Sequence, residues 1–285
     1  MCCGGWGITV SDAKYFSLLG LECSEKTRRI LDCALAPADD PSPERYAVMK
    51  PSYEGKCRLI DENGLCSLQV ECGEGVLPAV CRMYPRSYTD EHAVCSASCE
   101  RTVELLMRKE PLTFSPEPQE PLYGYIKRMQ DRSLPLKERV MSLIKDAFGD
   151  GENRGADILL QLYADAMEEA GRDLHGIFAG DGAKRPERTD KIFPDMDMWL
   201  ENLMVNRMVM TGFPSGDVKT AVCGVACEYA ILQRVAAGCE TEIQFVDAVS
   251  DICRFICHTR FDKNSAAAMK RADAYNRTAL SSVIL

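Results

Sequence analysis

The stretch SGDVKTAVCGVACEYAILQRVAAG (residues 215–238) decides the fold class of this chain. Its apolar side chains recur every three or four positions, the spacing that places them on one face of an α-helix. Gly238 is the expected C-cap, because glycine readily adopts the left-handed conformation that ends many helices. We therefore predict one long amphipathic helix here. Its apolar face consists of Val218, Val222, Val225, Tyr229 and Leu232.

The same spacing predicts further helices on both sides of that segment. Ser11 is the expected N-cap of the first helix, and Gly20 is expected to end it. Strand patterns are sparse, and residues 180–190 are typical of a loop. The expected helices cover residues 11–20, 24–35, 99–110, 123–133, 135–149, 155–171, 196–213 and 241–261.

A proline-rich segment, KEPLTFSPEPQEPLYG (residues 109–124), separates two regions of different character. Proline lacks a backbone donor and favours extended conformations, so helices should not run through it. We predict a Cys-rich metal- or cluster-binding region over residues 1–115 and a helical domain over residues 116–285. The expected fold is mainly α, with an irregular Cys-rich N-terminal region packed on a C-terminal helical bundle.

Composition restricts the classes of function. The net charge is −9 and neither half of the chain is basic, which argues against a nucleic-acid partner. The N-terminus lacks the pattern of a signal peptide, and no apolar run reaches the roughly 18–20 residues that span a bilayer. We therefore expect a cytoplasmic protein that does not enter the membrane.

Fifteen cysteines are many for a chain of 285 residues, and in a cytoplasmic protein they should stay reduced. Such clusters bind metals or do redox chemistry, although cysteine is also a common buried apolar residue. We expect structural roles for Cys23, Cys33 and Cys72. The pairs at 223/227 and 253/257 are spaced to make a four-thiolate site, but their place on apolar helix faces favours core packing.

The central Cys-rich stretch is CRLIDENGLCSLQVECGEGVLPAVCRMYPR (residues 57–86), in which Asn63-Gly64 is typical of a tight turn. Its four cysteines are separated by gaps of eight, five and eight residues. Structural zinc sites instead use paired knuckles with short gaps, and the ferredoxin and radical cluster spacings are also absent. The spacing alone does not decide between a metal site and cysteines that serve as buried apolar residues.

Three blocks of the sequence together resemble the flagellin lysine-N-methylase (FliB) family. They are CCGGWGITV at residues 2–10, the stretch 57–86, and CSASCERTVELL at residues 95–106. The helical segment WLENLMVNRMVMTGFP (residues 199–214) is similar to a Glu-Asn-Leu helix of that family. The Cys-rich front also resembles the broader class of zinc- or iron-chelating domains.

The resemblance implies an S-adenosylmethionine-dependent methylase that acts on lysine side chains of a flagellin-like protein substrate and holds a [4Fe–4S] cluster. Two departures are Pro78, where the family often has cysteine, and the start at Met1, upstream of which family members usually extend. We therefore expect an N-terminally truncated copy. The implied cluster ligands are Cys2, Cys3, Cys57, Cys66, Cys81 and Cys99.

The methyl donor itself has no evident binding motif, because no Gly-rich Rossmann fingerprint follows a predicted strand. Tyr84 and Arg86 close the central stretch. Arg86 is a candidate to hold the carboxylate of the donor, and its alternative is a rigid turn paired with a local acid. Glu74 and Glu100 are candidate bases, and the sequence identifies no catalytic residue.

Two other classes of function stay open at this point. One is a non-enzymatic protein that binds zinc or iron, and the other is a truncated paralogue that acts only as a helical interaction module. His92 and His175 lack partner spacing and are expected in solvent, and His258 adds little beside Cys257. The methionines of residues 196–210 are expected in the core or on a partner surface.

Overall fold

The computed structural model describes residues 7–88, 93–149, 193–271, 275 and 280. They belong to two compact units, residues 1–84 and residues 85–285. The division lies upstream of the proline-rich segment at which we expected it. The reason is that the hairpin and the short helix between residues 86 and 106 pack against helices of the second unit.

Over residues 7–84, the first unit combines a small antiparallel sheet of order β1-β3-β2 with four short α-helices. Its core is formed by apolar residues such as Leu18, Leu31 and Leu68, which are fully buried. The elements are β1 (Ile8–Val10), α1 (Asp12–Leu19), α2 (Glu25–Ala34), β2 (Leu35–Pro37), β3 (Ala47–Met49), α3 (Ser67–Cys72), a 3-10 turn (Glu74–Val76) and α4 (Ala79–Met83).

The ends of α1 and α2 follow from their sequences. The side chain of Ser11 accepts a hydrogen bond from the backbone N–H of Lys14, and Gly20 is the C-cap of α1, as predicted. Ser24 caps α2 in the same way by accepting from the N–H of Thr27 at 3.2 Å. Each serine satisfies a backbone donor that the first turn of a helix leaves without an intrahelical partner.

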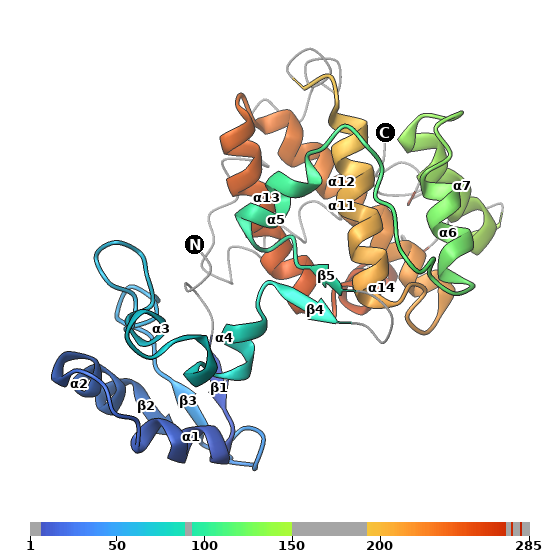
Figure 1. The fold of residues 1–285 in the computed structure, drawn as a ribbon. Coiled ribbons are helices and arrows are strands. Elements are labelled where there is room, and N and C mark those ends of the chain that lie inside the picture. Colours follow the sequence, from blue (N-terminus) through green and yellow to red (C-terminus); the bar gives the residue numbers. More distant parts are fainter. Residues whose placement is uncertain (1–6, 89–92, 150–192, 272–274, 276–279, 281–285) are drawn as a thin grey trace. The chain divides into compact units, whose positions relative to one another are not determined.

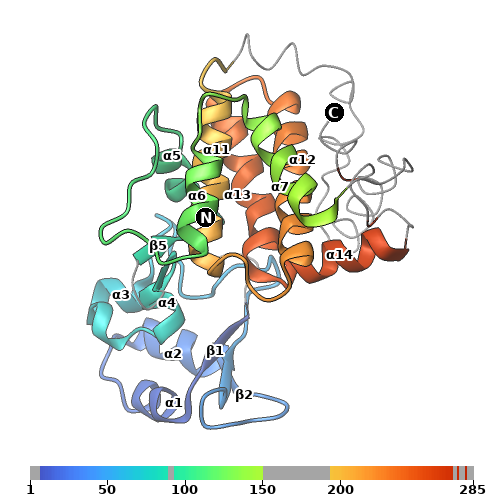
Figure 2. The same cartoon turned by 90° about the vertical axis from the view of Figure 1, so that its right-hand side faces the viewer.

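Over its described residues, the second unit is a bundle of helices with one short hairpin, and α11 and α12 lie side by side within it (Figure 1). Figure 2 shows α6 and α7 beside these two helices. None of the helices in the described ranges is long and apolar enough to cross a bilayer. The elements are β4 (Arg86–Tyr88), β5 (Ala93–Cys95), α5 (Glu100–Leu106), α6 (Leu122–Met129), α7 (Leu136–Phe148), α11 (Met196–Thr211), α12 (Val218–Gly238), α13 (Glu242–His258) and α14 (Phe261–Arg271).

The mainly helical class is thus confirmed, and most predicted helices form. The predicted helix 155–171 and loop 180–190 lie outside the described residues. The segment 241–261 was wrongly expected to be one helix, because Thr259 is extended and a new helix starts at Phe261. This break lets Phe261 turn back and become buried in the core.

The predicted apolar face of α12 is buried except for Val218, which is 38% exposed in the first turn. The C-cap prediction was wrong by one position, since Gly238 still belongs to the helix and Cys239 is the cap. Cys239 is extended and donates its N–H to the carbonyl of Ala236, so the helix ends without a left-handed residue.

Helix α11 is buried along nearly its whole length, including polar positions. The prediction that its methionines serve the core is confirmed: Met196, Met204 and Met208 are buried, and Met198 and Met210 pack against the same cluster. The buried polar residues of α11 are Glu201, Asn202, Asn206 and Arg207.

Arg207 joins three helices of the bundle. Its Nε donates to Glu228 on α12 at 2.8 Å, and one terminal nitrogen donates to Asp262 on α14 at 3.0 Å. Asp262 approaches so closely that a Cβ at Gly224 of α12 would lie 1.9 Å from its Oδ1. Glycine is therefore required at position 224 for α12 and α14 to meet at this distance.

The substitution Gly224→Ala should destabilise the second unit by roughly 1–3 kcal/mol, because an added methyl overpacks a contact that Arg207 holds in place. Urea unfolding of the full chain measures this change. Gly124→Ala on α6 is the matched control. The atom nearest to a Cβ at Gly124 is Oε2 of the exposed Glu120, which accepts from the N–H of Gly124 at 3.1 Å. This side chain can rotate away at the cost of one exposed hydrogen bond, so alanine should change stability by less than about 1 kcal/mol. Equal stability of Gly224→Ala and the parent would refute the close-approach argument.

Candidate metal and ligand site

Cys57 and Cys66 lie at the two ends of one tight loop in the first unit. Ile60 pairs with Cys66 in an isolated bridge, and the N–H of Ser67 donates to the carbonyl of Leu59 at 2.8 Å. The loop therefore brings the two cysteines into the same neighbourhood. Burial raises the pKa of the Cys57 thiol; a hydrogen bond from the backbone of Leu59 opposes this rise, and the nearby Cys66 adds to it.

The turn inside this loop forms around the predicted Asn63-Gly64 pair. Asp61 Oδ1 accepts from the N–H groups of Asn63 and Leu65, both at 2.9 Å. Gly64 has a φ of 77°, a left-handed conformation that glycine adopts without strain. The turn is thus held by its own residues, and it fixes the separation of Cys57 and Cys66.

Cys57 also lines a cavity of about 690 Å³ in the first unit. This volume lies within the range of about 300–1,000 Å³ that is usual for small-molecule sites. Charged side chains of both signs surround the cavity, together with the exposed thiol of Cys33. The charged residues are Arg29, Glu54, Lys56, Arg58, Asp61 and Glu62.

The other implied cluster ligands belong to different elements. Cys81 is exposed on α4, where Pro78 forms the N-cap. Cys99 is buried at the N-cap of α5 and belongs to the second unit. Cys2 and Cys3 lie outside the described residues. Within the described part of the chain, no group of three or more His, Cys, Asp or Glu residues is arranged to hold a metal ion.

Tyr84 and Arg86 stand on either side of the division between the units. Tyr84 is half-buried and ends α4, donating its N–H to the carbonyl of Val80. Arg86 is exposed on β4 opposite Cys95. Burial raises the pKa of the Cys95 thiol, and the positive charge of Arg86 works against this rise. A role for Tyr84 and Arg86 in cofactor binding stays a prediction.

The paired cysteines of the second unit serve the core, as predicted. Cys223, Cys227 and Cys253 are buried in the main apolar cluster, and Cys257 packs against it. A hydrogen bond with Cys227, followed by burial, raises the pKa of Cys223. A hydrogen bond with Cys257, followed by burial, likewise raises the pKa of Cys253. Cys223 and Cys253, held protonated in this way, are poor metal ligands, because metals bind the thiolate. The hydrogen bond with Cys253 lowers the pKa of Cys257.

A polar cluster that the sequence did not predict surrounds His258 at the end of α13. His258 Nε2 lies 2.8 Å from Ser98 Oγ and 3.2 Å from Ser96 Oγ, and the two hydroxyls are 2.7 Å apart. Burial and then the charge of Arg254 lower the pKa of His258. Arg254 also pairs with Glu100 at 3.6 Å. The cluster attaches residues 96–100 to α13, and no spacing in the sequence indicates it.

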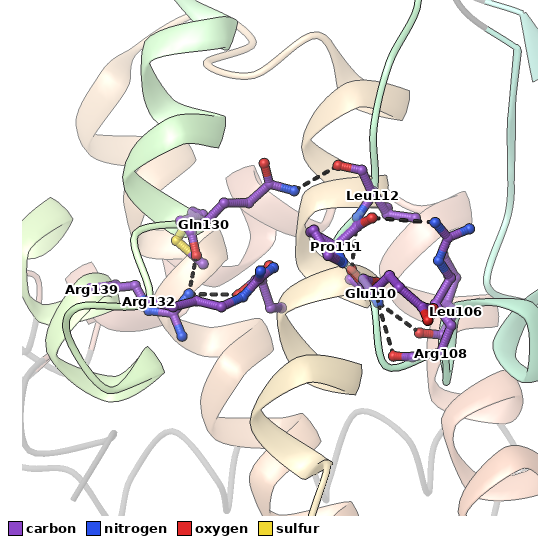
Figure 3. A network of polar contacts seen from close by, with 11 residues as sticks. Leu106, Arg108, Glu110, Pro111, Leu112, Gln130, Arg132 and Arg139 are labelled. Atoms are coloured by element: carbon purple, nitrogen blue, oxygen red, sulfur yellow. Dashed lines mark hydrogen bonds and ion pairs between the residues drawn. The ribbon is translucent and has the colours of Figure 1, made fainter.

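Asn202 of the Glu-Asn-Leu segment fixes the start of the proline-rich segment. Its Nδ2 donates to the carbonyl oxygens of Leu106 and Glu110, both at 3.1 Å, and its Oδ1 accepts from the N–H of Leu112 at 3.2 Å. Gln130, the C-cap of α6, donates from its Nε2 to the carbonyl of Leu112 at 2.9 Å (Figure 3). This irregular segment is thus held by side chains that replace the hydrogen bonds of a regular element.

Glu201 is fully buried and accepts hydrogen bonds from two arginines. Arg132 lies before α7, and Arg139 lies in the first turn of α7. Arg139 donates to Glu201 at 2.7 Å and also to the carbonyl of Met129. Arg132 approaches from a more exposed position (Figure 3). The Glu-Asn pair of α11 therefore acts in the structure of the bundle and belongs to the second unit, whereas Cys57 and its cavity belong to the first.

Comparison of the chain with protein-family models, with curated proteins and with solved structures found no match. The resemblance of the Cys blocks therefore stays an interpretation of the sequence.

The substitution Glu201→Gln should destabilise the protein by roughly 3–5 kcal/mol, because it leaves the buried charge of Arg139 without a carboxylate. Arg132→Gln is the matched control: Arg132 is 38% exposed and Glu201 would keep Arg139, so the loss should be at most about 1 kcal/mol. Urea unfolding compares the two variants. Similar losses would contradict the assignment of Arg139 as the essential partner.

Glu228 should make stability depend on pH. Burial raises the pKa of its carboxyl from 4.5 to about 7, against the opposing effect of Arg207. Between these two values the folded state binds more protons than the unfolded state, so the free energy of unfolding falls as pH rises. Across this pH range the free energy of unfolding of the parent should fall by about 3 kcal/mol. This fall should be absent in the variant Glu228→Gln. Denaturant unfolding across this range gives both profiles, and parallel profiles would show that the carboxyl does not titrate there.

Proposed function

We propose that this chain is an S-adenosylmethionine-dependent protein-lysine N-methylase that acts on a flagellin-like substrate and holds an iron–sulfur cluster through its N-terminal cysteines. The observation that carries the proposal is the pair Cys57 and Cys66, which lie at the two ends of one tight loop, with Cys57 lining a charged cavity. The resemblance of the Cys blocks supplies the reaction class, and the cavity supplies a place for a small polar cofactor.

Cys57 and Cys66 fit as two of the four thiolates that a [4Fe–4S] cluster takes. The remaining ligands would come from Cys81, Cys2 and Cys3. A bound cluster would link the segments that carry its thiolates and would stabilise the loop beside the cavity. The raised pKa of Cys57 means that binding must release its proton, so affinity should rise with pH.

The cavity beside Cys57 suits a zwitterionic cofactor, because cations and carboxylates line it together. Arg29 pairs with Glu25, and Lys56 pairs with Glu54. Arg58 uses its Nε to hold the carbonyl of Pro51 at 3.1 Å, which leaves its terminal nitrogens to receive a carboxylate. We assign Arg58 as the residue that orients the donor in the first unit.

Methyl transfer to lysine needs a neutral amine, whereas the unperturbed pKa of lysine is about 10.4. A carboxylate at the site can accept the proton. Among the carboxylates of the cavity, Asp61 is engaged by its own turn and Glu54 by Lys56. We therefore assign Glu62, which is exposed at the same cavity, as the proton acceptor.

A non-enzymatic zinc- or iron-binding protein is the second candidate. The observation that favours it is the pair Cys57 and Cys66 at the ends of one loop, because zinc accepts thiolate ligands as readily as a cluster does. Such a site would need no methyl donor and no protein substrate.

Metal analysis of the anaerobically purified chain separates these functions. We expect iron and sulfide with broad visible absorption, lost in Cys57→Ser and Cys66→Ser because each removes a thiolate from the pair. Cys33→Ser is the control, since Cys33 lines the same cavity but is not an expected ligand. Zinc without colour supports the second candidate. A metal-free protein would leave only a helical interaction module.

Catalysis is tested separately by incubating the cluster-loaded chain with S-adenosylmethionine and flagellin and measuring the mass of the flagellin. We expect the added mass of methyl groups on lysine. Glu62→Gln should lower the rate of this addition, most strongly at a pH below the pKa of the substrate amine. Arg58→Gln should raise the donor concentration needed for half-maximal rate. An intact cluster with no gain in mass would reject the methylase.

A further inference from the structure

Cys23 and Cys72 are brought together from segments that are far apart in the first unit's sequence. Cys23 lies just before α2, separated from it by the N-cap Ser24, and Cys72 is the last residue of α3. The sulfur of Cys72 lies 3.7 Å from the carbonyl oxygen of Glu22. That oxygen is about 2.8 Å from the next Cα by covalent geometry, so the sulfur lies within about 6.5 Å of the Cα of Cys23.

The side chain of Glu71 holds the two segments in this position. It accepts from the N–H and the hydroxyl of Ser24 at 3.0 and 2.8 Å, and from the hydroxyl of Thr27 at 2.5 Å. These bonds, the one from the Thr27 hydroxyl first, lower the pKa of the Glu71 carboxyl and keep it charged. Ser24, which follows Cys23, is therefore hydrogen-bonded to Glu71, which precedes Cys72.

Both thiols are also accessible and border the apolar core of the first unit. Cys23 and Cys72 are each half-buried and reduced, and both pack against the core cluster. A disulfide needs its two sulfur atoms to meet, and rotation of the two side chains can bring the sulfur of Cys23 toward that of Cys72, which lies within about 6.5 Å of the Cα of Cys23. The arrangement differs from that of the buried helical pairs, whose cysteines lie four residues apart on single helices.

We propose that Cys23 and Cys72 are a redox-active pair that forms a reversible disulfide by exchange with a low-molecular-weight disulfide. This disulfide would link the segment just before α2 to the end of α3. Because Cys66 is the N-cap of α3, the disulfide would also restrain the helix that follows Cys66. The proposal does not depend on the methylase function and revises the structural role expected for Cys23 and Cys72.

The exchange takes place in two steps. The thiolate of Cys23 attacks one sulfur of the small disulfide, whose S–S bond breaks and releases one thiolate. We assign the second step to Cys72, because burial raises the pKa of its thiol. Its thiolate attacks the sulfur of Cys23 and expels the second small thiolate. The two protein thiols lose two electrons and two protons, and the small disulfide is reduced to two thiols.

The test uses the full chain, reduced, desalted and titrated with oxidised glutathione, then alkylated, digested and mapped by mass spectrometry. We expect a linked pair of peptides containing Cys23 and Cys72 as the main intramolecular product. Closing this long loop should also raise the melting temperature of the oxidised protein by several degrees. Both effects should reverse on reduction.

Variants make the assignment specific. Cys23→Ser and Cys72→Ser should each abolish the linked peptides and leave a glutathione adduct on the remaining cysteine. Cys33→Ser removes an exposed thiol of the same unit and should keep the bond. Mapping of the parent protein needs no variant to fold. Separate glutathione adducts on Cys23 and Cys72 in the parent, or links from either to other cysteines as the main product, would overturn the proposal.

Discussion

Arg207 is the charge around which the second unit is arranged. A guanidinium that is fully enclosed must be paired, because an isolated buried charge costs several kcal/mol even after relaxation. Glu228 and Asp262 supply the counter-charges from α12 and α14, so three helices are tied to one side chain. The charges of Glu228 and Asp262 raise the pKa of Arg207 although burial opposes them, which keeps the residue ionised.

This pairing imposes geometry on its neighbours. Asp262 can reach Arg207 only where α12 has no side chain, at Gly224, and the chain must break after α13 so that α14 can present Asp262. On the same helix as Arg207, Glu201 and Asn202 organise the other contacts of the bundle. Helix α11 thus positions its neighbours through polar bonds, whereas its methionines fill the space between them.

The sequence predicts what depends on neighbouring residues. The helical periods, the serine cap of α1, the Asn63-Gly64 turn and the core role of the methionines all follow from local spacing and composition. Glu201 with Arg139, and His258 with Ser98, do not follow, because each pair is separated by many residues and only the packed helices bring its members together. Of the expected cluster ligands, only the proximity of Cys57 and Cys66 follows from the chain, since one short loop joins them.

The cysteines of the two units differ in chemistry because their surroundings differ. In the second unit, Cys223 and Cys253 are buried on helices, share hydrogen bonds with the next cysteine on the same face and are held protonated. In the first unit, Cys57, Cys66, Cys23 and Cys72 are half-buried at loop ends, where small molecules can reach them. A thiol needs both access and the thiolate form to bind metal or exchange with a disulfide. Access therefore distinguishes the half-buried cysteines of the first unit from Cys223 and Cys253, which serve the bundle as packing material.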